Sequence, residues 1–385
     1  MFSHLPQLFG FPPKSAQFLN MRKLWQRLLL AVLFSPATCV CAQQLPKGLD
    51  SLFYGKQGIH TRYPDLGLSI GVVRGPATAY YALGNTQPLQ GVPLDSTTLF
   101  EIGSVTKTFT ALLLAYEQEA GKLPKGAYLE SLLPATVSLR PGLRHRVTLT
   151  AMASHQSGLP NLSNDRYIQA LIDKDSVQPF HSVSRDYLFK ILRETDSLQA
   201  PGTYHYNNFA FSLLGTLLAQ RAGRSYGDLV QQRIAQPLGL RTTGLTYQTA
   251  HIAGRFTTKG EVRPAIVINA VAPAGGLKSN VVDLVRYVRA QLKPPAGLLG
   301  RAIIRTQQPV YHDSTITMGL AWEIRQLAGH RVYQKDGDTF GNSSLVRFDR
   351  DRQVGVIILA NHQDAKAVAE AGDLVYQYLL LNQPL

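Results

Sequence analysis

Cysteine is almost absent from this sequence of 385 residues, with Cys39 and Cys41 its only two. Both lie in an N-terminal stretch with the features of a leader peptide, so the mature chain is expected to contain none. This excludes a disulfide framework, a cysteine nucleophile and a cysteine-ligated metal in the mature protein. A His-Glu-x-x-His motif is also missing, which argues against a metal hydrolase. We expect neither a metal nor a cofactor.

The apolar run near the N-terminus, residues 28–34, is too short to span a membrane, which takes about 20 residues. Arg22 and Lys23 precede it, and Val40-Cys41-Ala42 supplies small residues at the −3 and −1 positions. This pattern is typical of a secretory signal peptide. We therefore predict an N-terminal extension and signal peptide at 1–42, removed in the mature chain, a single domain at 43–385, and export to the periplasm or beyond the cell. A buried N-terminal helix and a lipoprotein anchor are the alternatives.

Runs of basic residues are missing, although the chain has a net charge of +14. Four basic residues and no acidic ones lie in positions 1–42, so the rest of the chain keeps +10. The lysines and arginines are scattered, without a zinc finger or a basic helix, which argues against a nucleic-acid partner. A basic surface that favours anionic partners, or the cell envelope, is the simpler interpretation. The sequence does not indicate an oligomeric state.

Short apolar runs with β-forming residues stand near both ends of the chain. Residues 68–73 and 77–83 flank Arg74-Gly75-Pro76, which predicts a hairpin. Residues 331–334, 344–348 and 354–360 predict three more strands, with a polar turn at 349–353. Helical spacing over 364–381 places Val368, Ala371, Val375, Tyr378 and Leu379 on one face.

The middle of the chain has helical patterns instead. Helices are predicted over 105–120, ending at Gly121, over 209–222, ending at Gly223, and over 281–292, capped by Asn280. The predicted class is α+β: one antiparallel sheet built from both chain ends and flanked by helices, with an all-helical insert between.

Three short motifs carry candidate chemistry. Ser104-Val105-Thr106-Lys107 places a serine at a helix start and a lysine one turn later, on the same face. A serine hydroxyl needs a nearby base, and a lysine can act as one if its pKa is lowered. Taken alone, the motif is common, and a capping serine beside a solvated lysine is its ordinary alternative.

The second motif, Tyr206-Asn207-Asn208, opens an apolar helix. The tyrosine offers a phenol whose proton is lost more easily near positive charge, and Asn208 offers a donor and an acceptor to a substrate amide. An N-cap at Asn208 beside a half-buried tyrosine is the ordinary alternative. The third motif, Lys335-Asp336-Gly337, ends a predicted short strand, followed by Asp338 and Thr339. A charged turn is its ordinary alternative.

In this order and spacing, the three motifs resemble those of the serine β-lactamase and penicillin-binding protein superfamily. A tyrosine opening the second motif resembles the class C β-lactamases, D-alanyl-D-alanine carboxypeptidases and β-lactamase-like esterases. The resemblance extends to short segments at 99–103, 155–160, 237–240, 277–280 and 359–361. It therefore spans roughly residues 48–381. It implies a β-lactamase/transpeptidase-like fold and a serine hydrolase that works through an acyl-enzyme without a cofactor.

The resemblance also implies roles for individual residues. Ser104 would be the nucleophile, Lys107 and Tyr206 would move its proton, and Lys335 would lower the tyrosine pKa and attract a substrate carboxylate. For the substrate it implies binding by Asn208, Gly337, Asp338 and Thr339, with the backbone N–H groups of 104 and 338 as the oxyanion hole. His155 and Ser157 are expected to be structural.

One departure concerns the acyl donor. Asp336 stands where the lactamases have threonine, and a carboxylate there would repel a substrate carboxylate. A class C-like β-lactamase acting on a β-lactam or related amide is the first expectation. A D-alanyl-D-alanine carboxypeptidase or endopeptidase acting on peptidoglycan peptides and a carboxylesterase are the alternatives on the same fold. A non-hydrolysing penicillin-binding sensor is the alternative of another class.

Overall fold

The computed structural model describes residues 47–381, apart from 57, 89, 163–165, 248 and 250. The predicted signal peptide and its cleavage site lie outside the described residues. The α-helices are α2 (Lys47–Tyr54), α3 (Ile59–Arg62), α4 (Thr106–Glu119), α5 (Leu149–Ala153), α6 (Arg166–Lys174), α7 (Arg185–Glu194), α8 (Asn208–Arg221), α9 (Tyr226–Val230), α10 (Gln236–Leu238), α11 (Ala272–Gly275), α12 (Val281–Leu292), α13 (Leu298–Thr306) and α14 (Ala365–Leu381). Short helical turns are η1 (Gly103–Val105), η2 (Leu129–Ser131), η3 (Pro141–Leu143) and the π-turn η4 (Gln231–Ala235).

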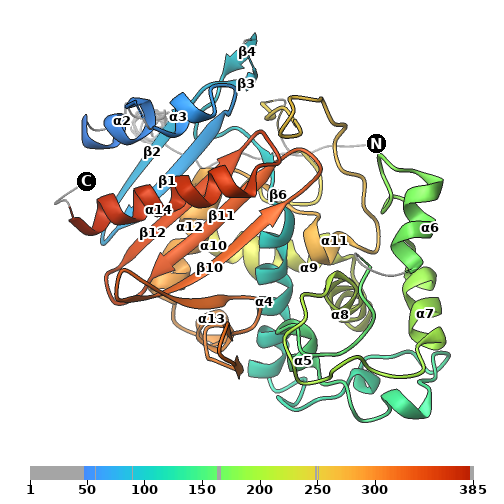
Figure 1. Ribbon diagram of the computed structural model, residues 1–385. Coiled ribbons are helices and arrows are strands. Elements are labelled where there is room, and N and C mark those ends of the chain that lie inside the picture. The colour runs from blue at the N-terminus through green and yellow to red at the C-terminus, as the bar shows by residue number, and fades with distance from the viewer. Residues whose placement is uncertain are drawn as a thin grey trace, which may run out of the picture. The chain divides into compact units, whose positions relative to one another are not determined.

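The strands are β1 (Leu68–Arg74), β2 (Ala77–Leu83), β3 (Asn85–Gln87), β4 (Gln90–Pro93), β5 (Phe100–Glu101), β6 (Lys278–Ser279), β7 (Tyr311–His312), β8 (Thr317–Met318), β9 (Glu323–Leu327), β10 (His330–Asp338), β11 (Ser343–Asp349) and β12 (Val354–Ala360). Eight of them form one antiparallel sheet in the order β2-β1-β12-β11-β10-β9-β8-β7. Strands from both chain ends therefore lie side by side, which confirms the predicted α+β class (Figure 1).

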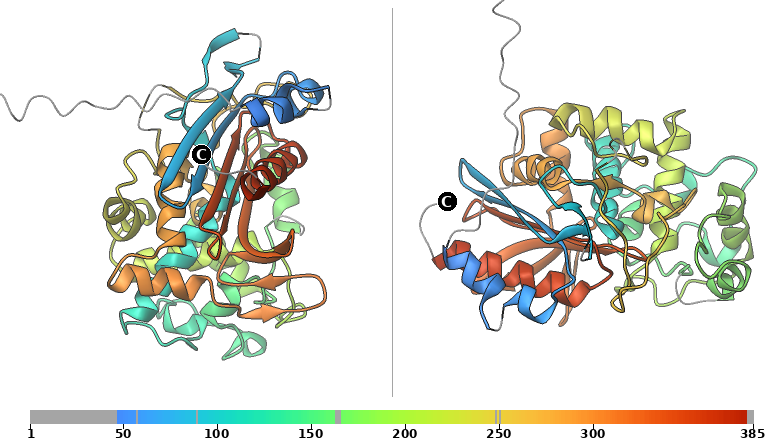
Figure 2. Two further views of the ribbon diagram at one scale, coloured as in Figure 1. Left: turned by 90° about the vertical axis from the view of Figure 1, so that its left-hand side faces the viewer. Right: turned by 90° about the horizontal axis from the view of Figure 1, so that it is seen from above.

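The two faces of the sheet are covered by different helices (Figure 2). Along β12, Val356 and Ile358 pack in a core cluster with residues of α2 and α14, while Ile357 and Leu359 belong to the cluster that contains α4 and α12. This alternation follows from the two-residue period of a strand. Because both faces are covered, every residue of β11 and β12 is buried.

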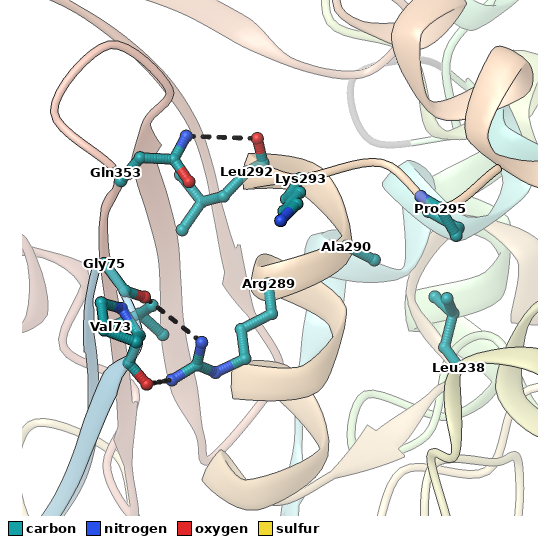
Figure 3. Close-up of a pocket in the computed structure, with 10 residues that line it drawn as sticks. Val73, Gly75, Leu238, Arg289, Ala290, Leu292, Lys293, Pro295 and Gln353 are labelled. Atoms are coloured by element: carbon teal, nitrogen blue, oxygen red, sulfur yellow. Dashed lines mark hydrogen bonds between the residues drawn. The ribbon is translucent and has the colours of Figure 1, made fainter.

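The hairpin at the N-terminal side of the sheet formed as predicted, with Arg74 opposite Ala77 and Gly75 at φ +53° in the turn. Arg289 of α12 fastens this hairpin (Figure 3). Its guanidinium donates hydrogen bonds to the carbonyl oxygens of Gly75, Pro76 and Ala77 at 2.7–3.3 Å. The hairpin end of the sheet is thereby tied to the helix that covers it.

The helical region between β4 and β7 contains α4, which leads away from η1 into the core. Helices α8 and α11 pack beside α4 at Gly215, where an added Cβ would lie 2.2 Å from Pro273 and 3.3 Å from Thr110. Glycine at this position lets the three helices approach closely. Among the described helices, none is both long and apolar enough to cross a membrane.

Three details differ from the sequence predictions. Strand β10 continues to Asp338, because residues 336–338 pair with 343–345 of β11, so Lys335-Asp336-Gly337 lies within a strand rather than at its end. Strands β3 to β9 were not predicted; four of them, β5 to β8, have two residues each and show no alternation. On α14 the fully buried tyrosine is Tyr376, and Tyr378 is only partly buried.

Candidate active site

Ser104 lies in the tight turn η1, which runs directly into α4. Gly103 has φ +45°, and a Cβ added to it would lie 2.5 Å from the carbonyl oxygen of Asp338. A Cβ on Gly337 would in turn lie 2.6 Å from the backbone nitrogen of Ser104. The two glycines thus let η1 and β10 meet backbone to backbone, which brings the amides of Ser104 and Asp338 into one region.

Lys107 follows Ser104 by one turn and is fully buried. Its Nζ lies 2.9 Å from Ser104 Oγ, 2.8 Å from Asn208 Oδ1 and 2.7 Å from the carbonyl oxygen of Ala274. Burial, together with the positive charge of Lys335, holds the pKa of this amine well below its usual range. The Lys107 amine is therefore far easier to deprotonate than a solvated lysine.

Tyr206 closes the group from the other side, because its hydroxyl is hydrogen-bonded to Ser104 Oγ. The Nζ atoms of Lys107 and Lys335 lie 4.8 and 5.3 Å from the centre of its ring. Burial raises the pKa of the Tyr206 phenol and outweighs the opposing effect of Lys335. Lys335 lowers the pKa of Tyr206, in the direction that the resemblance implies, but burial raises this pKa by more.

The start of α8 positions Asn208. Its neighbour Asn207 is the N-cap, accepting the Ala210 N–H at 2.8 Å and donating to the Leu159 carbonyl at 2.7 Å. Asn208 is therefore the first residue of the helix and not its cap, and its side chain contacts Lys107 instead. His155 accepts the Asn207 N–H at 3.0 Å and packs its ring 4.6 Å from that of Tyr206. These contacts fit the structural role predicted for His155.

Lys335, in β10, is buried beside Tyr206 and has two acidic neighbours. Its Nζ lies 3.3 Å from Asp336 Oδ1 and 3.9 Å from Glu323 Oε1. Burial lowers the pKa of Lys335, but the Tyr206 phenol and the carboxylates of Asp336 and Glu323 outweigh burial and raise this pKa. Lys335 therefore stays an ammonium, whereas Lys107 is poised to be neutral.

Comparisons with known proteins agree with this geometry. The model of the family described as "Beta-lactamase" matches residues 58–379. The chain belongs to the β-lactamase family. A β-lactamase of Pseudomonas fluorescens is 28% identical over 77% of this chain and 88% of its own length. An Escherichia coli D-alanyl-D-alanine-carboxypeptidase/endopeptidase is 23% identical over 71% of this chain and 68% of its own.

Solved structures show the same fold. A β-lactamase/D-alanine carboxypeptidase from Pseudomonas syringae superposes with a TM-score of 0.74 and 25% identity, covering 87% of this chain and 99% of that one. This confirms the predicted membership in the serine β-lactamase and penicillin-binding protein superfamily, and with it a serine hydrolase of that superfamily.

Two predicted substrate-binding residues of this β-lactamase family member have other contacts. Thr339 is buried, and its Oγ1 accepts the N–H groups of Gly341 and Asn342 at 3.4 and 3.1 Å. These contacts place the Thr339 hydroxyl in the β10–β11 turn. Asp338 stays exposed, and its carboxylate accepts a hydrogen bond from the Ser343 hydroxyl.

Several residues around the site were missed from the sequence. Asn161 donates to the Tyr206 carbonyl at 2.6 Å and accepts the Asn208 N–H at 3.1 Å, and its place just after residues 155–160 was the available signal. Ala274 and Glu323 had no local signal, since they contact the lysines only through tertiary packing. A separate cavity of about 620 Å³ lies between the β1–β2 hairpin and α12, and none of the eight predicted site residues lines it (Figure 3).

Proposed function

We propose that this chain hydrolyses an amide or ester through an acyl-enzyme formed on Ser104. The observation that carries the proposal is that Ser104 Oγ contacts both the Lys107 amine, at 2.9 Å, and the Tyr206 hydroxyl. A serine becomes a nucleophile when a positioned base takes its proton, and two candidate proton carriers touch this hydroxyl. In the described part of the chain no group of acidic, histidine or cysteine side chains could hold a metal ion.

The hydrogen-bond inventory favours Lys107 as the base. A neutral amine has two N–H donors and one lone pair, and three oxygens surround this nitrogen. The donors suit the acceptor oxygens of Asn208 and Ala274, which leaves the lone pair for the Ser104 O–H. The lowered pKa of Lys107 supports this assignment. The raised pKa of Tyr206 keeps the phenol protonated, so Tyr206 is assigned to deliver a proton to the leaving group.

The remaining proposed roles follow from position. Attack by Ser104 creates a negative oxygen, and the N–H groups of 104 and 338 are assigned to stabilise it. Asn208 is assigned to the substrate amide and Gly337 to the close approach of substrate along β10. Loss of the leaving group gives an acyl-serine, which water then hydrolyses. Lys335 is assigned to keep positive charge beside the Tyr206 ring while the proton moves.

The proposed acyl donor is a β-lactam or a related amide, handled as in class C β-lactamases. The similarity to a Pseudomonas fluorescens β-lactamase supports this choice. A D-alanyl peptide is the second candidate, favoured by the similarity to a carboxypeptidase/endopeptidase of Escherichia coli. A carboxylic ester would use the same chemistry. The proposed location is the periplasm or the outside of the cell, following the predicted signal peptide.

Mass spectrometry of the full chain after brief exposure to benzylpenicillin tests the proposal. We expect a transient adduct on the peptide that contains Ser104, and none in Ser104→Ala. Labelling that persists in Ser104→Ala would place the nucleophile elsewhere. A stoichiometric adduct without release would instead identify a sensor, and recovery of free enzyme with product would identify a hydrolase.

A further inference from the structure

The charged side chains beside the proposed nucleophile have no net positive charge, so they do not form an anion-binding site. On β10, the cation that lies beside the Tyr206 ring is Lys335, and only 4% of its side chain is exposed. Its Nζ faces the Asp336 carboxylate at 3.3 Å and the Glu323 carboxylate at 3.9 Å. The single positive charge of Lys335 is therefore shared between two negative ones.

Arg325 neutralises one of these carboxylates. Its Nε and a terminal nitrogen both donate to the same oxygen, Glu323 Oε2, at 3.0 and 2.8 Å. Two cations and two anions then balance to zero. A hydroxyl in place of Asp336 would leave the same group at +1, which is what a substrate carboxylate would require.

Asp336 is also the most accessible of these charged partners of Lys335. Half of its side chain, 51%, is exposed, whereas the side chain of Glu323 is 9% exposed. Its negative charge is close enough to affect the pKa of Lys107, Tyr206 and Tyr204. A substrate that approaches along β10 therefore meets the carboxylate of Asp336 before the ammonium of Lys335.

Neighbouring groups do not restore a positive charge. Two residues further along β10, Asp338 adds a second exposed carboxyl group. Arg255 packs against Gly341, which follows β10. Its guanidinium donates hydrogen bonds to the Tyr247 hydroxyl and to the carbonyl oxygens of Ala253 and Arg263. These contacts hold the Arg255 charge within its own loop.

Aromatic rings complete this side of the site. The rings of Tyr204 and Tyr311 stack with their centres 6.5 Å apart. Burial raises the pKa of Tyr204 to about 12, and Glu323 adds to this effect, so its phenol stays neutral. A ring face next to a carboxylate attracts ammonium groups and does not attract carboxylates.

We infer that the substrate part lying against β10 at position 336 carries an ammonium or other cationic group, and that Asp336 is the specificity-determining residue that selects it. This inference rests on the proposed acyl transfer at Ser104. Tyr206, assigned to protonate the leaving group, lies beside Lys335, so the part at position 336 is taken as the leaving group. Among the proposed acyl donors, the inference favours an ester or amide with a cationic leaving group over one that carries a carboxylate there. In the reaction the Ser104 oxygen bonds to the carbonyl carbon, the bond to the leaving group breaks, and that group departs with a proton. Water then releases the acid.

Three matched aryl esters test the inference. Phenylacetylglycyl esters of 3-hydroxybenzoate, 3-hydroxybenzamide and 3-(aminomethyl)phenol share one acyl group and carry charges of −1, 0 and +1 on the leaving group at neutral pH. At low ionic strength we expect kcat/KM to be highest for the cationic ester and lowest for the anionic one. The two should differ by at least about fivefold, since one charge contact is worth that much even under solvent screening.

Two variants assign the preference to Asp336. Asp336→Thr and Asp336→Asn should reduce the difference between the charged esters to about twofold, and thermal unfolding followed by circular dichroism reports whether they fold. Asp351→Thr removes the same charge from the polar turn between β11 and β12 and should keep the wild-type order.

The outcomes separate the two proposals. A wild-type preference for the anionic ester, or a difference between the charged esters that stays at the wild-type value in both Asp336 variants, overturns the inference, while loss of all three activities in Ser104→Ala would still uphold acyl transfer. Failure of the wild-type chain to hydrolyse any ester and to be acylated at Ser104 would overturn both.

Discussion

The backbone of Gly103 lies so close to Asp338 that a Cβ on the glycine would come within 2.7 Å of the Asp338 nitrogen and 2.5 Å of its carbonyl oxygen. The proposed nucleophile follows this glycine directly, and the Asp338 amide is a proposed oxyanion donor. One close contact therefore sets the position of both groups.

Gly103→Ala should consequently lose activity as well as stability. The methyl group must push η1 away from β10, and φ of +45° adds backbone strain of about 1 kcal/mol. We expect kcat/KM to fall by about 10²-fold or more, because a misplaced oxyanion donor costs that much. Ester hydrolysis and thermal unfolding measure the two effects.

Gly121→Ala is the matched control. Gly121 has φ +71° but no atom within 4 Å of an added Cβ. The Gly121→Ala variant should lose a similar amount of stability from backbone strain and keep its activity. Equal activities of the two variants would show that the contact with Asp338 does not position the site.

Replacing Lys107 by arginine tests the assignment of the base. Arginine keeps the positive charge but does not lose its proton in proteins. General-base catalysis is typically worth about 10²–10⁴-fold, and the acylation rate should fall by that order. Lys125→Arg, on the exposed surface, should leave the rate unchanged. A Lys107→Arg variant that acylates at the wild-type rate would rule out Lys107 as the base, and Tyr206 would then take that role.

The strands and helices that carry the motifs were predictable from the sequence because each has a local pattern. Residues 68–73 and 77–83 are apolar, β-forming runs that flank a glycine turn, and Asn280 caps α12 through the Asp283 N–H as expected. Local pattern did not suffice where tertiary pairing decides the structure. Strand β10 extends through Gly337 only because β11 lies beside it, and β7 and β8 are too short to show a period.

The site was predictable in its motif residues and not in their partners. Ser104, Lys107, Tyr206 and Lys335 stand in recognisable sequence motifs, and the structure brings them together. The Ala274 carbonyl and the Glu323 carboxylate reach the two lysines from distant segments, so no spacing indicates them. The net direction of the Tyr206 pKa was not predictable either: Lys335 lowers it, but burial raises it by more, and burial cannot be predicted from a three-residue motif.

The lowered pKa of Lys107 predicts how stability depends on pH. An unfolded lysine titrates near pH 10.4, so between the folded pKa of Lys107 and about pH 10.4 the unfolded chain binds more protons. The free energy of unfolding contributed by this group therefore rises with pH in that window. Lys107→Met should flatten this rise in urea unfolding measured at several pH values, and the wild-type acylation rate should increase as pH rises through the same pKa. An identical slope in the variant would contradict a buried amine of low pKa.

Glu101, in β5, binds two residues that lie far from it in the sequence, Tyr247 and Ile266. The carboxylate is buried, and its Oε1 accepts the Ile266 N–H at 2.7 Å and the Tyr247 hydroxyl at 3.0 Å. Glu101→Ala would leave both donors without this acceptor, and we expect a loss of about 2–4 kcal/mol in the free energy of unfolding. Glu101→Gln keeps an acceptor oxygen of the same reach and should lose less than half as much in urea unfolding. Equal losses would mean that the negative charge itself, which lies near Lys278 and Arg255, holds the loop rather than the two hydrogen bonds.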